Sequence, residues 1–384
     1  MNNFIHSIPT KVYFGKGQLA HLSEIKESGS KVLVVSGEGS IKKNGIYNKV
    51  LNILRTAGLR IYELPGVKSN PEISSVREGV KICKTNSVNM ILAVGGGSVI
   101  DTAKVIAGGA SYGGDSWSIV IHPRYILKAL PVYAVVTHVG SGSETNGSAV
   151  ISDPGHDKCG TTSPLLRPVM TICDPEFTYT VNDKQTAAGT AEIMTSALES
   201  YFTNVEGGYL QARFCEGIMK TCIAYGPVAV AEPENYDARA NLMWASANSF
   251  NGILSEGAET VRCAHLMEYA LSVYYDLVPG QGLAVLVPHL MKFALNEETA
   301  GKFAEYGRNV WGIAGDDNME VSEAAIGRTG EFFANELHMP TTLRELGIED
   351  ESRFEDIASK AAGCRDAYVP LTEEDIVTIL KAAF

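Results

Sequence analysis

Short apolar runs alternate with amphipathic helical stretches throughout the first half of the chain. The apolar runs end in glycine or threonine, at 31–37 (KVLVVSG), 90–96 (MILAVGG) and 131–137 (PVYAVVT). Between them, apolar residues recur at helical spacing over 42–57 and 72–85. Runs this apolar are typical of strands buried on both faces, and strands that alternate with helices form parallel sheets covered by those helices. The pattern therefore predicts a parallel α/β domain.

The second half of the chain shows helical periodicity without strand signals. After 173–180 (CDPEFTYT), the expected helices are 183–204, 208–225, 236–255, 259–276 and 284–296. The last helix has a clear start, because Thr372 follows Pro370 as an N-cap and Asp375 stands three residues later. A chain of 384 residues exceeds the length that one hydrophobic core serves. We therefore expect an α/β domain at 1–182 and an all-α domain at 183–384.

A glycine-rich segment, 93–104 (AVGGGSVIDTAK), joins a predicted strand directly to a predicted helix. Glycine lets a ligand approach the backbone closely, and a helix N-terminus offers N–H donors and a positive dipole end to a phosphate. A tight turn without a ligand is the alternative interpretation. The strand–glycine–helix context favours a pyrophosphate site, to which we assign Gly95, Gly96, Gly97, Ser98 and Asp101.

Two further loops, 36–45 (SGEGSIKKNG) and 137–150 (THVGSGSETNGSAV), also follow predicted strands and are rich in small residues. The first is not the dinucleotide fingerprint, because it reads G-x-G-x-x-K. Ligands of open α/β sheets nevertheless bind at the carboxyl ends of strands. The three loops together predict a dinucleotide crevice, to which we also assign Gly37, Glu38, Gly39, Ser40, Thr137, His138 and Ser141.

The charge balance limits which partners the chain can bind. The formal net charge is −12 and no basic run is present, which excludes a phosphate-backbone partner such as nucleic acid. The N-terminal residues lack a signal-peptide pattern, and no segment has the ~20 apolar residues of a membrane span. Seven scattered cysteines without a C-x-x-C pair indicate reduced thiols. We expect a soluble, cytoplasmic protein without a membrane or nucleic-acid partner.

Several longer motifs resemble the iron-containing (group III) alcohol dehydrogenase family, most closely its butanol dehydrogenase branch. They include PTKVYFGKGQ, ILAVGGGSVIDTAK, GSGSETNGSAVIS, SPLLRPVMTICDPEFTYT, KQTAAGTAEIM, YDARANLMWAS and PLTEEDIVTILKAAF, and they run from end to end of the chain. The resemblance implies the dehydroquinate synthase-like fold, with an N-terminal dinucleotide domain and a helical C-terminal domain. It also implies NAD(P), a small-molecule substrate and a homodimer or other homo-oligomer, and we add Lys158 to the cofactor-binding residues.

The resemblance further implies a divalent metal that polarises the oxygen of an alcohol or aldehyde. Its four ligand positions carry Glu192, Ser196, His265 and Pro279 here. Serine is a poor ligand for iron or zinc, proline has no side-chain donor, and stable sites take three or four protein ligands. We therefore expect no bound metal, with a weakened site on Glu192 and His265 as the alternative.

Three residues near the degenerate metal positions are candidates for catalysis. Tyr269 stands where the family has a further histidine, one helical turn after His265, so both side chains share a helix face. A phenol can protonate a carbonyl oxygen if its pKa falls below its ordinary value of about 10. His265 is either functional or a hydrogen-bonded helix residue, and His138 is either a proton relay or a surface residue.

Glu38 guides the choice of nucleotide. The family branch typically has glycine there, which leaves room for the 2′-phosphate of NADP, whereas a carboxylate repels that phosphate and accepts a hydrogen bond from a 2′-hydroxyl. NAD is therefore favoured over NADP, unless the Glu38 side chain points to solvent. We expect an NAD(P)-dependent oxidoreductase of a small alcohol or aldehyde that lacks the usual metal. The alternatives are a catalytically silent nucleotide-binding subunit and a nonredox enzyme on the same fold.

Overall fold

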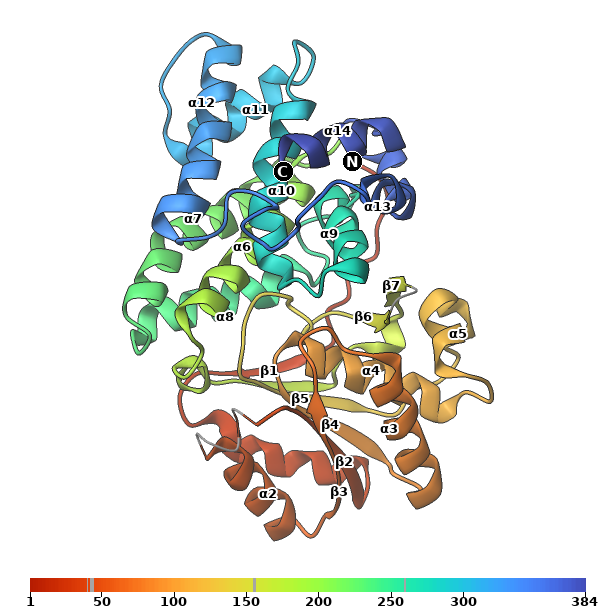
Figure 1. Cartoon of the computed structure of the whole chain (residues 1–384). Coiled ribbons are helices and arrows are strands. Elements are labelled where there is room, and N and C mark those ends of the chain that lie inside the picture. The colour runs from red at the N-terminus through yellow and green to blue at the C-terminus, as the bar shows by residue number, and fades with distance from the viewer. Residues whose placement is uncertain (40, 42–44, 155–156, 259) are drawn as a thin grey trace. The chain divides into compact units, whose positions relative to one another are not determined.

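The computed structural model describes residues 1–39, 41, 45–154, 157–258 and 260–384 (Figure 1). These residues form two compact units. We call them the sheet unit, which contains Ser7–Val181 and Pro233–Asn251, and the helical unit, which contains Met1–His6, Asn182–Glu232 and Gly252–Phe384. The chain first leaves the sheet unit after Val181, next to the boundary that the sequence predicts at 182.

Helix α8 (Tyr236–Ser249) belongs to the sheet unit, although its helical pattern predicts a place in the all-α domain. Polar contacts with loops of the sheet unit explain this difference. Ser246 Oγ accepts a hydrogen bond from the backbone N–H of Gly140 (3.0 Å), and Thr145 Oγ1 donates to the carbonyl of Ala247. Periodicity along a helix shows which face is buried but not which domain buries it.

Among the described residues, the sheet unit contains a six-stranded sheet in the order β1, β8, β5, β4, β2, β3. All neighbouring strands are parallel, so their carboxyl ends lie along one edge. The three apolar runs form β2, β4 and β5, which confirms the predicted strands. The strands are β1 (Lys11–Phe14), β2 (Lys31–Gly37), β3 (Arg60–Val67), β4 (Met90–Gly95), β5 (Val132–Val136) and β8 (Met170–Cys173).

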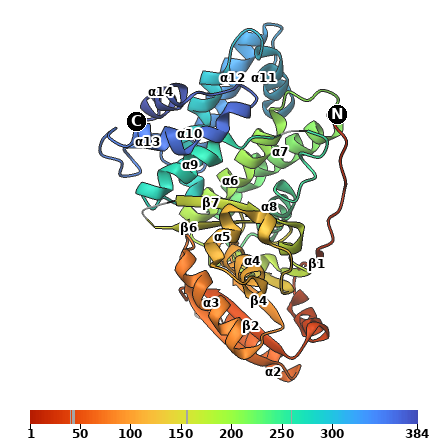
Figure 2. The same cartoon turned by 90° about the vertical axis from the view of Figure 1, so that its right-hand side faces the viewer.

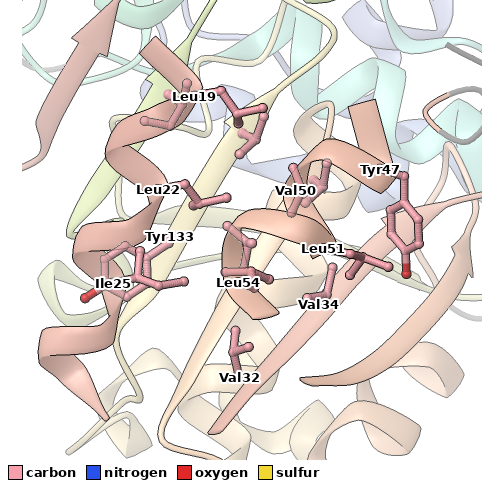
Figure 3. Close-up of a cluster of buried hydrophobic side chains, with 14 of the residues drawn as sticks. Leu19, Leu22, Ile25, Val32, Val34, Tyr47, Val50, Leu51, Leu54 and Tyr133 are labelled. Atoms are coloured by element: carbon pink, nitrogen blue, oxygen red, sulfur yellow. The ribbon is translucent and has the colours of Figure 1, made fainter. Parts of the chain in front are cut away.

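Helices cover both faces of this sheet. On one face, η1 (Gln18–Ser28) and α2 (Ile46–Thr56) direct apolar side chains onto β2 and β5, as Figure 3 shows. Tyr47, Val50, Leu51 and Leu54 recur at helical spacing and are all buried. The opposite face is covered by α3 (Ile73–Asn86) and α4 (Gly97–Ser111), as Figure 1 shows.

Smaller elements complete the sheet unit. An antiparallel hairpin of β6 (Ser148–Asp153) and β7 (Asp157–Thr162) lies apart from the main sheet and contacts α4. The short helices are α5 (Ser116–Ile121), η2 (Pro123–Tyr125), η3 (Pro164–Leu166) and η4 (Pro175–Thr178).

The helical unit is built around α6 (Asp183–Tyr201), which contacts α7 (Tyr209–Ala231), α9 (Cys263–Tyr274) and α10 (Pro279–Ala294) (Figure 2). Helix α10 begins earlier than predicted, because Pro279 occupies its first turn, where a missing N–H costs nothing. Within the described ranges, no helix is long and apolar enough to cross a membrane. The remaining helices are α11 (Ala300–Tyr306), η5 (Gly307–Trp311), α12 (Asn318–Glu331), η6 (Phe332–Glu336), α13 (Phe354–Lys360), η7 (Ala362–Asp366) and α14 (Glu373–Ala382).

Helix α14 begins with the predicted capping box. The hydroxyl of Thr372 accepts from the backbone N–H of Asp375, whose carboxylate in turn accepts from the N–H of Thr372. With the parallel sheet and the helical unit, this confirms the predicted fold class.

Candidate functional site

The loops after β4 and β5 pack directly against each other at the carboxyl edge of the sheet. A Cβ atom on Gly97 would lie 2.1 Å from Ser141 Oγ, and one on Gly96 would lie 2.9 Å from the Cβ of His138. Gly96 has an ordinary φ of −86°, so glycine is required here for space rather than for an unusual backbone angle. The structure thus brings together two of the three loops that the sequence assigns to a nucleotide.

Helix α4 begins inside this contact. Its first hydrogen bonds run from the N–H groups of Val99 (3.1 Å) and Ile100 (3.2 Å) to the carbonyl of Gly96. The N–H groups of Gly97 and Ser98 therefore belong to the first turn, where a helix presents donors and a positive dipole end to an anion. Thr137 joins the same edge, because its N–H donates to the carbonyl of Gly95 (3.1 Å).

The strand order places a topological switch between β2 and β4. The chain leaves β2 toward β3 on one side and then returns to form β4 on the other side, and ligands of open α/β sheets bind at such points. Gly37 ends β2 close to α4, since a Cβ there would lie 3.8 Å from Val99 Cγ2. Glu38 follows with an exposed side chain, and Gly39 is partly exposed. Ser40 lies outside the described residues.

A buried lysine, Lys104, fastens α4 to the loop after β5. Its ammonium donates to Ser143 Oγ (2.7 Å), to Asn146 Oδ1 (3.0 Å) and to a backbone carbonyl. Asp101 lies one turn earlier, and its carboxylate accepts from Ser143 Oγ and from the N–H of Val150 (2.9 Å). These bonds give Asp101 a structural role that its sequence position did not indicate, and its contact with a nucleotide stays a prediction.

Burial shifts the pKa values of the charged groups in this network. It lowers the pKa of Lys104 to about 8 and raises that of Glu144 to about 7. It also raises the pKa of Asp101, against the attraction of Lys104 and of Lys158 on β7. Among the described residues, Glu144 Oε1 has no hydrogen-bond partner. A charged Glu144 is therefore costly in the folded state, and the protonated form prevails there below about pH 7.

The predicted metal positions all lie in the helical unit. Glu192 and Ser196 stand one turn apart on α6, and Ser196 is 0% exposed. His265 lies on α9 and is paired with Glu199, whose Oε2 is 2.6 Å from the ring Nδ1. The other oxygen of Glu199 accepts from the N–H of Ala264 (2.8 Å), so this carboxylate also caps the start of α9.

Sequence reasoning missed Glu199. Only its polarity on an otherwise buried helix, three residues after Ser196, could have indicated it. Because Nδ1 of His265 is held by this carboxylate, a role of His265 toward a ligand falls to Nε2.

Arg262 supplies a positive charge at the position of the missing ligand. It is the N-cap residue of α9, and its Nη1 donates to Ser196 Oγ at 2.7 Å. The Ser196 hydroxyl, at the position where the resemblance implies an imidazole, is thus held by a guanidinium, a group that stays charged at any ordinary pH. The sequence reading did not single out Arg262, because its partner lies 66 positions away along the chain.

The other two substituted positions are also defined. Pro279 is at the start of α10, and the next residue, Gly280, packs so closely on α6 that a Cβ would lie 2.0 Å from the carbonyl oxygen of Ala188. Tyr269 lies with His265 on one face of α9, with the two ring centroids 6.1 Å apart in an edge-to-face arrangement.

These residues do not fit the divalent metal that the family resemblance implies. In the described part of the chain, no group of three or more His, Cys, Asp or Glu side chains could hold a metal ion. Ser196 accepts its hydrogen bond from a cation, and Pro279 offers no donor. Two unit charges 4 Å apart repel by about 4 kcal/mol at an effective dielectric constant of 20, and a dication beside Arg262 doubles this.

Comparisons with known proteins agree with the fold and with the motifs. Residues 9–175 match the family described as iron-containing alcohol dehydrogenase, and residues 186–384 match the C-terminal part of the Fe-containing alcohol dehydrogenase family. NADH-dependent butanol dehydrogenase A of Clostridium acetobutylicum is 46% identical, with 100% of both chains covered. NADPH-dependent aldehyde reductase YqhD of Escherichia coli is 37% identical, with 92% of this chain and 91% of the relative covered.

A solved structure shows the same architecture over the whole chain. The crystal structure of NADH-dependent butanol dehydrogenase A from Thermotoga maritima superimposes with a TM-score of 0.95 at 33% identity, covering 100% of this chain and 99% of that one. The family resemblance predicted from the sequence motifs is confirmed by these matches.

We predict that Gly97→Ala weakens NADH binding by at least about tenfold, because the new methyl group would collide with Ser141 and spread the two loops. Removing the obstacle in the double variant Gly97→Ala, Ser141→Gly should restore most of the affinity. Gly113→Ala is the matched control, since nothing lies within 4 Å of a Cβ there. Fluorescence titration with NADH measures all four proteins, and equal affinities in all of them would contradict a nucleotide at this edge.

We predict that Glu144 makes stability fall as pH rises. Its folded-state pKa is raised from 4.5 to about 7, so its contribution is fully present below pH 4.5 and is lost as pH rises through about 7. A shift of this size corresponds to about 3 kcal/mol. Between these pH values the thermal midpoint of Glu144→Gln should therefore decline less steeply than that of the wild type. The midpoint of Glu78→Gln, which changes an exposed carboxylate, should decline as steeply as that of the wild type. Identical pH profiles for the two variants would contradict the assignment.

Proposed function

The chain belongs to the iron-containing alcohol dehydrogenase family and is an alcohol dehydrogenase-like oxidoreductase; we propose that it interconverts a small aldehyde and its alcohol with NAD(H), without the family's metal. The observation that carries this proposal is a contrast between the two units. The nucleotide edge of the sheet unit keeps its close-packed glycine loop, whereas the metal positions of the helical unit carry serine and proline. We further propose that the chain acts as a homodimer or other homo-oligomer.

The preference for NAD(H) rests on Glu38. This side chain follows the carboxyl end of β2, beside the switch point, and is exposed rather than tied into the fold. A carboxylate there opposes the 2′-phosphate of NADP and can accept a hydrogen bond from the free hydroxyl of NAD. Both nucleotides occur among the relatives, because the Clostridium relative is named NADH-dependent and YqhD is named NADPH-dependent.

The absence of metal rests on the donor set. Glu192 and His265 alone provide two ligands, fewer than stable sites use, and Arg262 places a guanidinium on the residue that should be a third.

The proton that completes aldehyde reduction is assigned to Tyr269. Its phenol lies one turn beyond His265 on α9, and the two rings touch edge to face. Glu199 fixes the orientation of the His265 ring through Nδ1. We propose that Tyr269 donates a proton to the reacting oxygen and that His265 supports it. His138, whose Cβ lies 2.9 Å from a Cβ built on Gly96, stays a candidate proton relay.

Glu38→Gln should raise the affinity for NADPH relative to NADH by about tenfold, since it removes a charge next to the expected position of the 2′-phosphate. Glu78→Gln, which removes an exposed carboxylate from α3 in the same unit, should leave the ratio unchanged. Parallel fluorescence titrations with the two nucleotides give the ratio. If it is the same in both variants and the wild type, Glu38 does not face the ribose.

The metal proposal predicts that the wild-type protein holds less than about 0.1 iron or zinc per chain after incubation with either ion and desalting, because only two ligands remain. The triple variant Ser196→His, Pro279→His, Arg262→Leu should retain metal under the same treatment. Elemental analysis gives the content, and NADH oxidation with straight-chain aldehydes before and after EDTA gives the turnover. Turnover that EDTA abolishes would contradict the proposal. NADH binding without any turnover would favour the alternative of a catalytically silent nucleotide-binding subunit.

A further inference from the structure

Arg262 places a guanidinium at Ser196, one of the four positions to which the family resemblance assigns the metal. Its guanidinium is hydrogen-bonded to Ser196 Oγ at 2.7 Å, and Ser196 is fully buried on α6. The same helix face carries Glu192 one turn earlier, so the position that loses an imidazole still has a carboxylate nearby. A cation at this place offsets the negative charge of Glu192.

The backbone next to Arg262 is also held to α6. Arg262 is the N-cap residue of α9, and the next residues, Ala264 and His265, donate their N–H groups to Glu199 of α6 (2.8 and 3.3 Å). Two independent contacts, one through Ser196 and one through Glu199, therefore join the start of α9 to α6. The contact with Ser196 holds the Arg262 side chain in one orientation, as a catalytic group requires.

We infer that the guanidinium of Arg262 replaces the divalent cation as the group that binds and polarises the substrate's reacting oxygen. This inference rests on the proposed aldehyde–alcohol reaction. A guanidinium presents several N–H donors in one plane and keeps its charge, so it can stabilise negative charge that develops on oxygen. It cannot release a proton at ordinary pH, and the proton must come from another group.

A hydride with its two electrons leaves NADH and bonds to the carbonyl carbon, while the π electrons of the C=O bond move to the oxygen. NADH becomes NAD⁺, and the alkoxide is stabilised by Arg262 until it receives a proton from Tyr269, which recovers its own from solvent. Oxidation of the alcohol is the reverse, so no further oxidant or reductant is required.

The test compares wild type with Arg262→Met, which keeps the length of the side chain without its charge, and with Arg262→Lys, which keeps a point charge. The matched control is Arg365→Met, because Arg365 lies in the same unit with a side chain that is 66% exposed. Butanal reduction is the activity readout, and added guanidinium chloride is the rescue reagent, with sodium chloride at equal ionic strength beside it. Calorimetry with butyramide, a neutral carbonyl analogue, and with butyrate gives binding without turnover.

We expect Arg262→Met to lower kcat/KM for butanal by roughly a hundredfold, comparable to the loss of an oxyanion donor, with NADH affinity unchanged. Guanidinium should restore at least about a tenth of the lost activity, whereas sodium chloride should not, and a merely structural role would not produce this difference. Butyramide affinity should fall about tenfold in Arg262→Met and less in Arg262→Lys. If the methionine variant folds poorly, the affinity of the lysine variant still tests the inference. Arg365→Met should match wild type.

Three results would overturn the inference. The first is unchanged butyramide affinity in both Arg262 variants, or no butyramide binding by the wild type. The second is tighter binding of butyrate than of butyramide by the wild type, which would make Arg262 a carboxylate anchor. The third is loss of wild-type activity in EDTA that iron or zinc restores. Failure to bind NADH would instead contradict the proposed function, and calorimetry on the nucleotide-free protein would still decide the role of Arg262.

Discussion

A single buried ammonium group, that of Lys104, holds together the loops at the carboxyl edge of the sheet. It donates to the loop after β5 at Ser143 and Asn146, while Asp101 binds the same Ser143 hydroxyl from the preceding turn of α4. Through these bonds the N-terminus of α4 and the loop at 137–148 share one rigid arrangement. Removing one member of a buried charged network leaves its partners without their hydrogen bonds, so the geometry of the glycine loop depends on the buried Lys104.

The two candidate sites differ in what limits their residues. At the nucleotide edge the limit is space, because Gly97 lies against Ser141 and no larger residue fits without movement. At Ser196 the constraint is charge, because the guanidinium of Arg262 would repel a dication at this place.

Sequence reasoning identified the features that depend on neighbouring residues. The apolar runs gave β2, β4 and β5, and the spacing of Thr372 and Asp375 gave the capping box of α14, because these depend on residues a few positions apart. It did not place α8 in the sheet unit, and it did not find Glu199 or Arg262. Their partners lie 66 positions away, and only the folded chain brings them into contact.

The hydrogen bond between Arg262 and Ser196 also bears on how this chain can change over evolutionary time. A single Ser196→His substitution would place an imidazole on α6 against the guanidinium of Arg262. A single substitution at Arg262 would leave the buried hydroxyl of Ser196 without this donor and would not recreate a ligand. The effects of substitutions at these two positions are therefore not additive, so the two residues change more easily together than one at a time.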